Sequence, residues 1–178
     1  MRRFVSAAIV VCAGALPAAA QVNSGQLVVT MTVQSSISLV FENSTNVGAN
    51  GYCALTNAGT NNVGLDLGQA SVVTGDSLPC VAFTQPGSDY IVSSGFDVVV
   101  SKANSSSASY QLAAEISAAP PASVTWMVNN IPMTTTFTPI SLANAYSSRM
   151  AHTVGVRVKK TLPAQTLTET ITFLATAN

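Results

Sequence analysis

The chain has 178 residues, of which only 8% are charged, with seven basic side chains, seven acidic side chains and one histidine. So few charges, without a basic cluster, exclude the positive surface that nucleic-acid binding requires and the polybasic patch that attracts a membrane surface. The length is that of one ordinary domain.

The first twenty residues predict a secretory signal peptide. Arg2 and Arg3 precede an apolar run over residues 4–16, and the alanines at 18–20 are typical of a cleavage site. The run is too short to span a bilayer, and no later segment is apolar and long enough to do so. We therefore expect residues 21–178 to form a single exported domain with a net charge of −2, since two of the seven basic residues are removed. We expect it to be secreted, in the periplasm or at the cell surface.

Two cysteines remain after this cleavage, Cys53 and Cys80. In an oxidising compartment an isolated pair most simply forms one disulfide. The loop between them would contribute about 3 kcal/mol of stability. A metal site or a catalytic thiol is the competing interpretation, but it would need partner side chains, and the chain has only one histidine.

The clearest pattern in the chain runs from Leu27 to Phe41. Apolar residues occupy the odd positions with one break, at Ser35. Such period-two alternation is typical of a β-strand, because successive side chains of a strand point to opposite faces. The run is about twice the usual strand length. It either bends near Ser35 and serves two sheets or forms one long edge element.

Short strands and turns are predicted along the rest of the chain. After an irregular loop over residues 42–62, strands are expected around 65–68, 81–83, 90–100, 110–116, 124–128, 154–158 and 167–176. Asn129-Asn130 predicts a two-residue hairpin turn, and Pro132 and Pro139 favour a strand at a sheet edge. With no helical periodicity, the sequence predicts an all-β fold. The expected form is an immunoglobulin-like or pilin-like antiparallel β-sandwich of about seven to nine strands.

No catalytic or metal-binding motif accompanies these strands. The chain has no Gly-x-Ser-x-Gly motif whose serine His152 could activate as a base. His152 is therefore interpreted as a surface residue at a strand end. Asp76, Asp89 and Asp97 do not form a calcium-binding loop and are interpreted as solvated turn residues. Paired carboxylates could hydrolyse glycosides, but the sequence does not give their separation. We expect no catalytic residue, metal or cofactor, and no enzymatic activity.

The aromatic residues leave a second class of function open. Trp126 and Tyr110 lie in phase with core residues of their strands and are interpreted as packing residues. Tyr52 and Tyr146 fall in loops, where they would be free to contact a ligand. The alternative to a structural role is therefore a secreted β-sandwich module that binds carbohydrate or another ligand.

Three places in the sequence resemble the pilin-like sandwich of bacterial fimbrial subunits, of the spore coat protein U type. The signal peptide is followed at once by the alternating run, Leu65-Asp66-Leu67-Gly68 resembles the short strand after the first loop, and residues 167–173 resemble the terminal strand. The chain departs from the family pattern in two places. It has no cysteine near Ile37 in the first strand and no tyrosine in residues 175–178.

The resemblance implies a non-enzymatic, fimbria-like subunit that associates with further copies or with other surface subunits. Such subunits lack a final strand and borrow one from a neighbour by β-strand addition. The donor would be Gln26–Gln34. Its groove-filling side chains would be Leu27, Val29, Met31 and Val33. The alternative is that this strand pairs within its own domain.

Overall fold

The structure is a computed structural model that describes residues 30–32, 36–45, 53–71 and 80–178. Met1–Thr32 and Val33–Asn178 form separate units, and the fold given below is that of the second. The predicted signal peptide lies outside the described residues, as do three of the four predicted donor side chains. The fourth, Met31, has a side chain that is 80% exposed.

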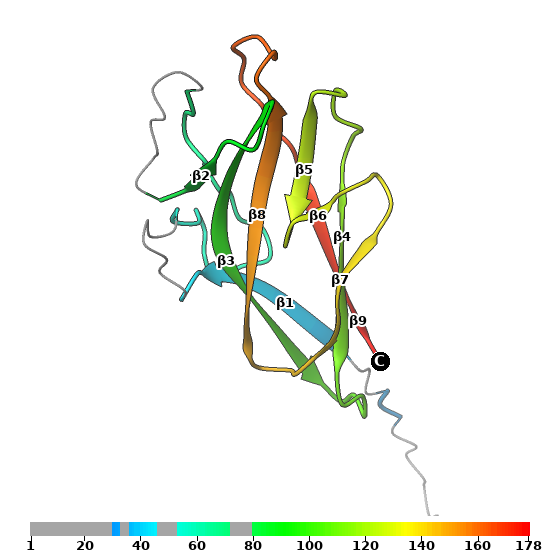
Figure 1. Ribbon diagram of the computed structural model, residues 1–178. Helices are drawn as coiled ribbons and strands as arrows, with labels where there is room; N and C mark the ends of the chain where they lie inside the picture. The colour runs from blue at the N-terminus through cyan, green and yellow to red at the C-terminus, as the bar shows by residue number, and fades with distance from the viewer. Residues whose placement is uncertain (1–29, 33–35, 46–52, 72–79) are drawn as a thin grey trace, which may run out of the picture. The chain divides into compact units, whose positions relative to one another are not determined.

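The second unit is all-β, with two antiparallel sheets and no helix among its described residues (Figure 1). Its described strands are β1 (Ser36–Asn43), β2 (Ala82–Thr84), β3 (Asp89–Ala103), β4 (Tyr110–Ile116), β5 (Val124–Val128), β6 (Ile131–Pro132), β7 (Thr138–Asn144), β8 (Arg149–Lys159) and β9 (Ile171–Ala177). The larger sheet has the order β1-β3-β8-β5-β6, with β2 also paired to β3, and the smaller sheet has the order β7-β4-β9. The predicted antiparallel sandwich of seven to nine strands is confirmed.

The core lies between the two sheets and follows from the period-two pattern of their strands. Val98 and Val100 of β3 belong to one buried cluster with Leu112 and Tyr110 of β4. Trp126 of β5 is half-buried and packs against this cluster and against a second one. The predicted packing roles of Tyr110 and Trp126 are therefore confirmed.

One lateral side of the sandwich is closed by the chain itself. Asn129 and Asn130 have φ values of 50° and 62° and form the predicted hairpin turn between β5 and β6. Pro132 lies in β6 and Pro139 in β7, and each strand is at the edge of its sheet, as predicted. Residues 133–137 then connect β6 to β7, so the chain passes from one sheet to the other on this side.

One expectation about the first third of the chain needs correction. The segment around Leu65 belongs to no strand, and the nearest bridge joins Thr56 to Gly64. Val63, Leu65 and Leu67 alternate with exposed residues and pack against the core, so the side-chain pattern of a strand is present without a neighbouring strand to pair with. Of the long alternating run, the structure describes residues 30–32 and 36–41, and the second of these ranges lies in β1.

Candidate functional site

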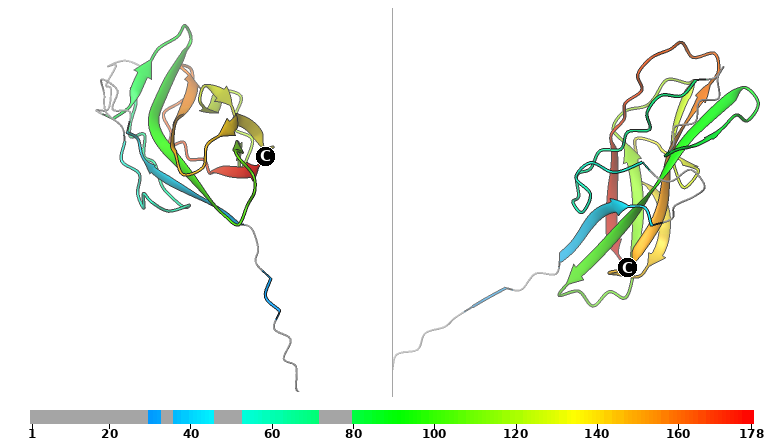
Figure 2. Two further views of the ribbon diagram at one scale, coloured as in Figure 1. Left: turned by 90° about the horizontal axis from the view of Figure 1, so that it is seen from below. Right: turned by 90° about the vertical axis from the view of Figure 1, so that its left-hand side faces the viewer.

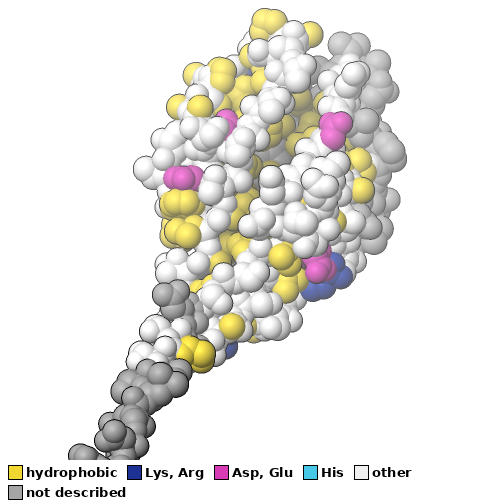
Figure 3. All heavy atoms as spheres, turned by 180° about the vertical axis from the view of Figure 1, so that it is seen from behind, with side chains coloured by type: hydrophobic (Ala, Val, Ile, Leu, Met, Phe, Trp, Pro, Cys, Tyr) yellow, Lys and Arg dark blue, Asp and Glu magenta, His cyan; other side chains and the backbone are white. Residues whose placement is uncertain are grey.

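On the opposite lateral side of the sandwich, no described strand joins the two sheets. β1 ends the larger sheet and β9 ends the smaller one, and the two strands do not pair with each other (Figure 2). A groove of about 1760 Å³ lies between them. Figure 3 shows hydrophobic side chains along the hollow in this face. The volume exceeds the roughly 300–1,000 Å³ of ordinary small-molecule pockets and suits an extended chain better.

Alternate apolar residues of the two edge strands line this groove. Residues 37–41 of β1 and residues 171–173 and 175 of β9 line it, and those that also belong to the core cluster or pack against it are Ile37, Leu39, Phe41, Ile171, Phe173 and Ala175. The inner face of the larger sheet also reaches it through Val154 and Val156 of β8. The described part of the chain gives the smaller sheet three strands, and no described strand lies opposite this part of the larger sheet. The groove therefore has the form of a sandwich that lacks one strand.

The ladder between β4 and β9 determines which backbone groups of β9 face the groove. The N–H of Asn178 donates to the carbonyl of Ser109 at 3.0 Å, and the antiparallel register continues from there. Because hydrogen-bonded and non-hydrogen-bonded residues alternate in such a ladder, even-numbered residues of β9 bond to β4. The N–H and C=O groups of Ile171, Phe173 and Ala175 consequently point away from β4, along the open edge.

The outer edge of β1 is only partly occupied. The N–H of Phe41 donates to the carbonyl of Thr60 at 2.8 Å, and the N–H of Gly59 donates to the carbonyl of Phe41 at 2.7 Å. By the same alternation, the backbone groups of Ile37 and Leu39 point to this side of β1. Neither of these two residues has a backbone partner there among the described residues.

The described charged residues that line the groove are both acidic, Asp66 and Glu169. The Glu169 carboxylate accepts hydrogen bonds from the Ser117 hydroxyl at 2.6 Å and from the Ser117 and Thr170 N–H groups, each at 3.0 Å. Slight burial raises the pKa of Glu169, but these bonds outweigh it and hold the pKa below its ordinary value of 4.5. Near neutral pH such a groove disfavours an acidic chain and accepts a neutral or basic one.

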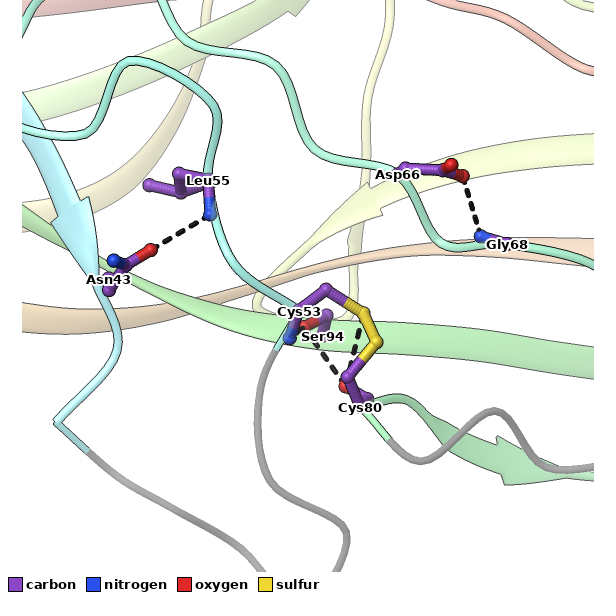
Figure 4. Close-up of a disulfide and its surroundings, with 7 residues drawn as sticks. All are labelled: Asn43, Cys53, Leu55, Asp66, Gly68, Cys80 and Ser94. Carbon is purple, nitrogen blue, oxygen red and sulfur yellow. Dashed lines mark hydrogen bonds between the residues drawn. A yellow bond between two sulfur atoms is a disulfide. The ribbon is translucent and has the colours of Figure 1, made fainter.

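The predicted disulfide between Cys53 and Cys80 is present and anchors the wall of the groove beyond β1 (Figure 4). The Ser94 hydroxyl of β3 accepts from the N–H of Cys53 at 3.0 Å and donates to the carbonyl of Cys80 at 3.3 Å. The N–H of Leu55 donates to the Asn43 side chain at 2.8 Å. Residues 55–71 contribute much of the groove lining, and these contacts fix the start of that segment to β1 and β3.

The interpretation of His152 as a surface residue is wrong, because its side chain is only 5% exposed. It shares the even-numbered face of β8 with Val154 and Val156, and that shared position is the signal that could have placed it inside. Its Nδ1 lies 2.9 Å from the amide nitrogen of Asn129, whose side-chain oxygen accepts from the N–H of Thr153 at 3.0 Å. In this arrangement Nδ1 accepts a hydrogen bond, so the imidazole is neutral.

We expect acid to destabilise the fold through His152. Burial lowers the pKa of His152 below its ordinary 6.5, and the opposing effect of Asp97 is smaller. The unfolded chain therefore takes up the proton first, so this contribution to stability is complete above pH 6.5 and decreases as the pH falls below it. Urea unfolding should give a lower midpoint at pH 5 than at pH 7, and His152→Leu should flatten that dependence. An equal pH dependence in His152→Leu would contradict the assignment.

The interpretation of Asp97 as a solvated acid is also wrong, because Asp97 is fully buried on the outer side of β3. Its Oδ2 accepts from the N–H of Thr45 at 3.1 Å and from the Thr45 hydroxyl at 2.9 Å. Arg149 places its Nε 3.5 Å from the same oxygen and also pairs with Glu42. The carboxylate thus holds residues 44–45 over the outer face of the sheet. Nothing in the local sequence indicates this cover.

Of the two aromatic residues predicted to be free, Tyr146 lies in the described part of the chain, in a loop as expected. Tyr146 is half-buried, its ring centre lies 5.3 Å from that of Tyr110, and the Lys102 amine lies 4.8 Å above it. Tyr52 lies outside the described residues. Among the described residues, no cluster of three or more His, Cys, Asp or Glu side chains could hold a metal ion. The same part of the chain contains no helix that could cross a membrane.

Comparison of the chain with models of known protein families and with curated proteins gives no match. The groove and its edges are therefore interpreted from their own geometry.

Proposed function

We propose that the protein is an exported, non-enzymatic structural subunit of the fimbrial kind, completed by the segment Gln26–Gln34 of a neighbouring copy. The observation that carries the proposal is the groove between β1 and β9. It combines an open edge of the smaller sheet, alternate apolar lining and the length of a strand. A strand added beside β9 would bond to the backbone groups that β9 directs away from β4 and would cover the core, which is the chemistry of β-strand addition.

The donor segment matches the groove in pattern, length and charge. Its alternate residues Leu27, Val29, Met31 and Val33 are apolar. Nine extended residues span about 30 Å, enough to follow the seven residues of β9 at about 3.3 Å per residue. Residues 21–34 contain no charged side chain, so the acidic groups of the groove do not repel them.

The disulfide supports export, because disulfides persist in oxidising compartments and are rare in the cytosol. It agrees with the predicted signal peptide over residues 1–20. The secreted ligand-binding module remains the alternative. In that case the groove would hold an extended ligand instead of a strand.

The test compares two forms recovered from the periplasm, residues 21–178 and residues 35–178. We expect the first to form polymers and the second to be monomeric, because deletion removes the donor strand but leaves the groove. Light scattering after size-exclusion chromatography measures the assembly state, and circular dichroism reports whether the monomer is folded. A folded monomer from both forms would contradict the proposal. A longer form that is monomeric and unfolds on deletion would show that the strand belongs to its own domain.

Two double substitutions, one on each face of the donor segment, test which face enters the groove. Val29→Asp with Met31→Asp should abolish polymers, because a charge without a partner is costly to bury in an apolar groove. Thr30→Asp with Thr32→Asp places the same charges on the other face and should leave polymers intact. Equal loss in both pairs would indicate a general effect of charge.

A further inference from the structure

A short hairpin occupies one position on the edge of β1. Its arms meet at Thr56 and Gly64, where the N–H of Thr56 donates to the carbonyl of Gly64 at 2.9 Å and the reverse bond measures 3.3 Å. Gly59 and Thr60 at its tip form the two bonds to Phe41 described above. The hairpin therefore uses both backbone groups that Phe41 presents to the groove side.

The tip of this hairpin is held by its own local contacts. Gly59 has a φ of +87°, in the left-handed region that favours glycine. The Thr60 hydroxyl donates to the carbonyl of Asn57 at 2.9 Å and accepts from the N–H of Asn62 at 3.2 Å. Because these bonds lie within the hairpin, they do not depend on what fills the groove.

Phe41 is itself fixed. Its side chain is buried, and its ring centre lies 6.0 Å from that of Phe96 and 5.2 Å from that of Phe173. Moving the backbone of Phe41 away from the hairpin would disturb this aromatic cluster. The bridge from β1 to the hairpin is thus fixed at both ends.

We infer that the hairpin of residues 56–64 limits where an added strand can pair with β1. The strand, supplied by a second copy, hydrogen-bonds to β9 at Ile171, Phe173 and Ala175. It hydrogen-bonds to β1 only near Ile37 and Leu39. This inference rests on the proposed function and adds the register of pairing to it.

The consequence is a groove with two different parts. At the start of β1 the added strand is held by backbone bonds on both sides. Beyond Phe41, backbone pairing comes from β9, and residues 55–71 contribute apolar side chains to the wall. By capping part of an exposed edge, the hairpin also reduces uncontrolled pairing at β1, which is a general hazard of edge strands.

Hydrogen exchange tests the inference on the full mature chain, residues 21–178. The monomer reference is the Val29→Asp, Met31→Asp protein, and the assembled sample is the unsubstituted polymer. Amides are read by NMR after exchange is quenched and the polymer dissolved. We expect the amides of Ile37, Leu39, Ile171, Phe173 and Ala175 to exchange at least about tenfold more slowly in the polymer. The amides of Phe41 and Gly59 should be protected equally in both samples.

Variants of two glycines add a second readout. Gly59→Pro removes the N–H that donates to the Phe41 carbonyl and cannot adopt the positive φ, so it should disturb the hairpin tip. The Phe41 N–H, which donates to the Thr60 carbonyl at this tip, should then lose protection in the monomer and regain it in the polymer. Gly87→Pro is the control, because Gly87 also has a positive φ, at +57°, with nothing near its Cβ position. It should leave the protection of Phe41 unchanged in both samples.

The outcomes separate the two proposals. Polymers in which the Gly59 amide loses protection would show that the hairpin is displaced, and polymers without new protection at Ile37 and Leu39 would show pairing with β9 alone. Either result overturns the inference and leaves the proposed function intact. Absence of polymers in the unsubstituted protein would overturn the proposed function and the inference with it.

Discussion

Replacing Phe96 with alanine is expected to lower the free energy of unfolding by about 3–5 kcal/mol, the usual cost of removing a buried phenyl ring. Phe96 is 4% exposed and lies at the centre of an aromatic cluster. Its ring centre lies 6.0 Å from that of Phe41, 5.6 Å from that of Phe173 and 5.8 Å from that of His152. The substitution therefore leaves a cavity under both edge strands of the groove.

Urea unfolding of the monomeric Val29→Asp, Met31→Asp protein measures this effect without interference from assembly. Phe137→Ala is the matched control, because Phe137 is 41% exposed and its loss should cost less than that of Phe96. Phe96→Leu keeps most of the volume and should fall between the two. A loss below about 1 kcal/mol for Phe96→Ala would mean that the aromatic cluster does not support the fold.

Several elements of the fold could be predicted because each is specified by residues that are close together in the sequence. The strands β3, β4, β5, β8 and β9 show alternating side chains between turn residues, and alternation depends only on the pleat of each strand. Asn129-Asn130 was predictable because asparagine tolerates the positive φ of a tight turn. The disulfide was predictable from the count of cysteines and from the compartment.

The groove could not be predicted because it depends on which strands end each sheet. β1 pairs with β3 and β9 with β4, and no local pattern in the sequence specifies these partners. The hairpin tip at Gly59 lies in a stretch rich in asparagine, glycine and threonine, which indicates a loop but not its contact with Phe41. The sequence therefore does not reveal which distant segments pair, and the groove depends on that pairing.

Two of the buried polar residues, His152 and Asp97, were misplaced for different reasons. His152 was judged by its type, although its position in phase with the valines of β8 indicated the inner face. Asp97 alternates correctly with the core residues of β3 and does lie on the outer side of the sheet. It is buried because residues 44–45 and Arg149 cover that outer side. Only the three-dimensional path of the chain shows this cover.

Replacing Cys53 and Cys80 together with serine is expected to lower the free energy of unfolding by about 3 kcal/mol, as the loss of a cross-link over a sequence separation of 27 predicts. The disulfide also fixes the start of the groove wall over residues 55–71, so we expect assembly to weaken in addition. Urea unfolding of the non-assembling monomer measures the first effect, and light scattering of the protein with an intact donor measures the second.

Ser94→Ala is the control for this prediction, because it keeps the disulfide and removes only the hydroxyl that bonds to Cys53 and Cys80. Its expected cost is about 1 kcal/mol, the usual net value of a hydrogen bond, with assembly retained. If the double serine protein is destabilised but assembles as well as the unsubstituted one, the disulfide stabilises the fold without shaping the groove. If it loses assembly under conditions where circular dichroism shows it folded, the anchored wall is part of the site that receives the strand.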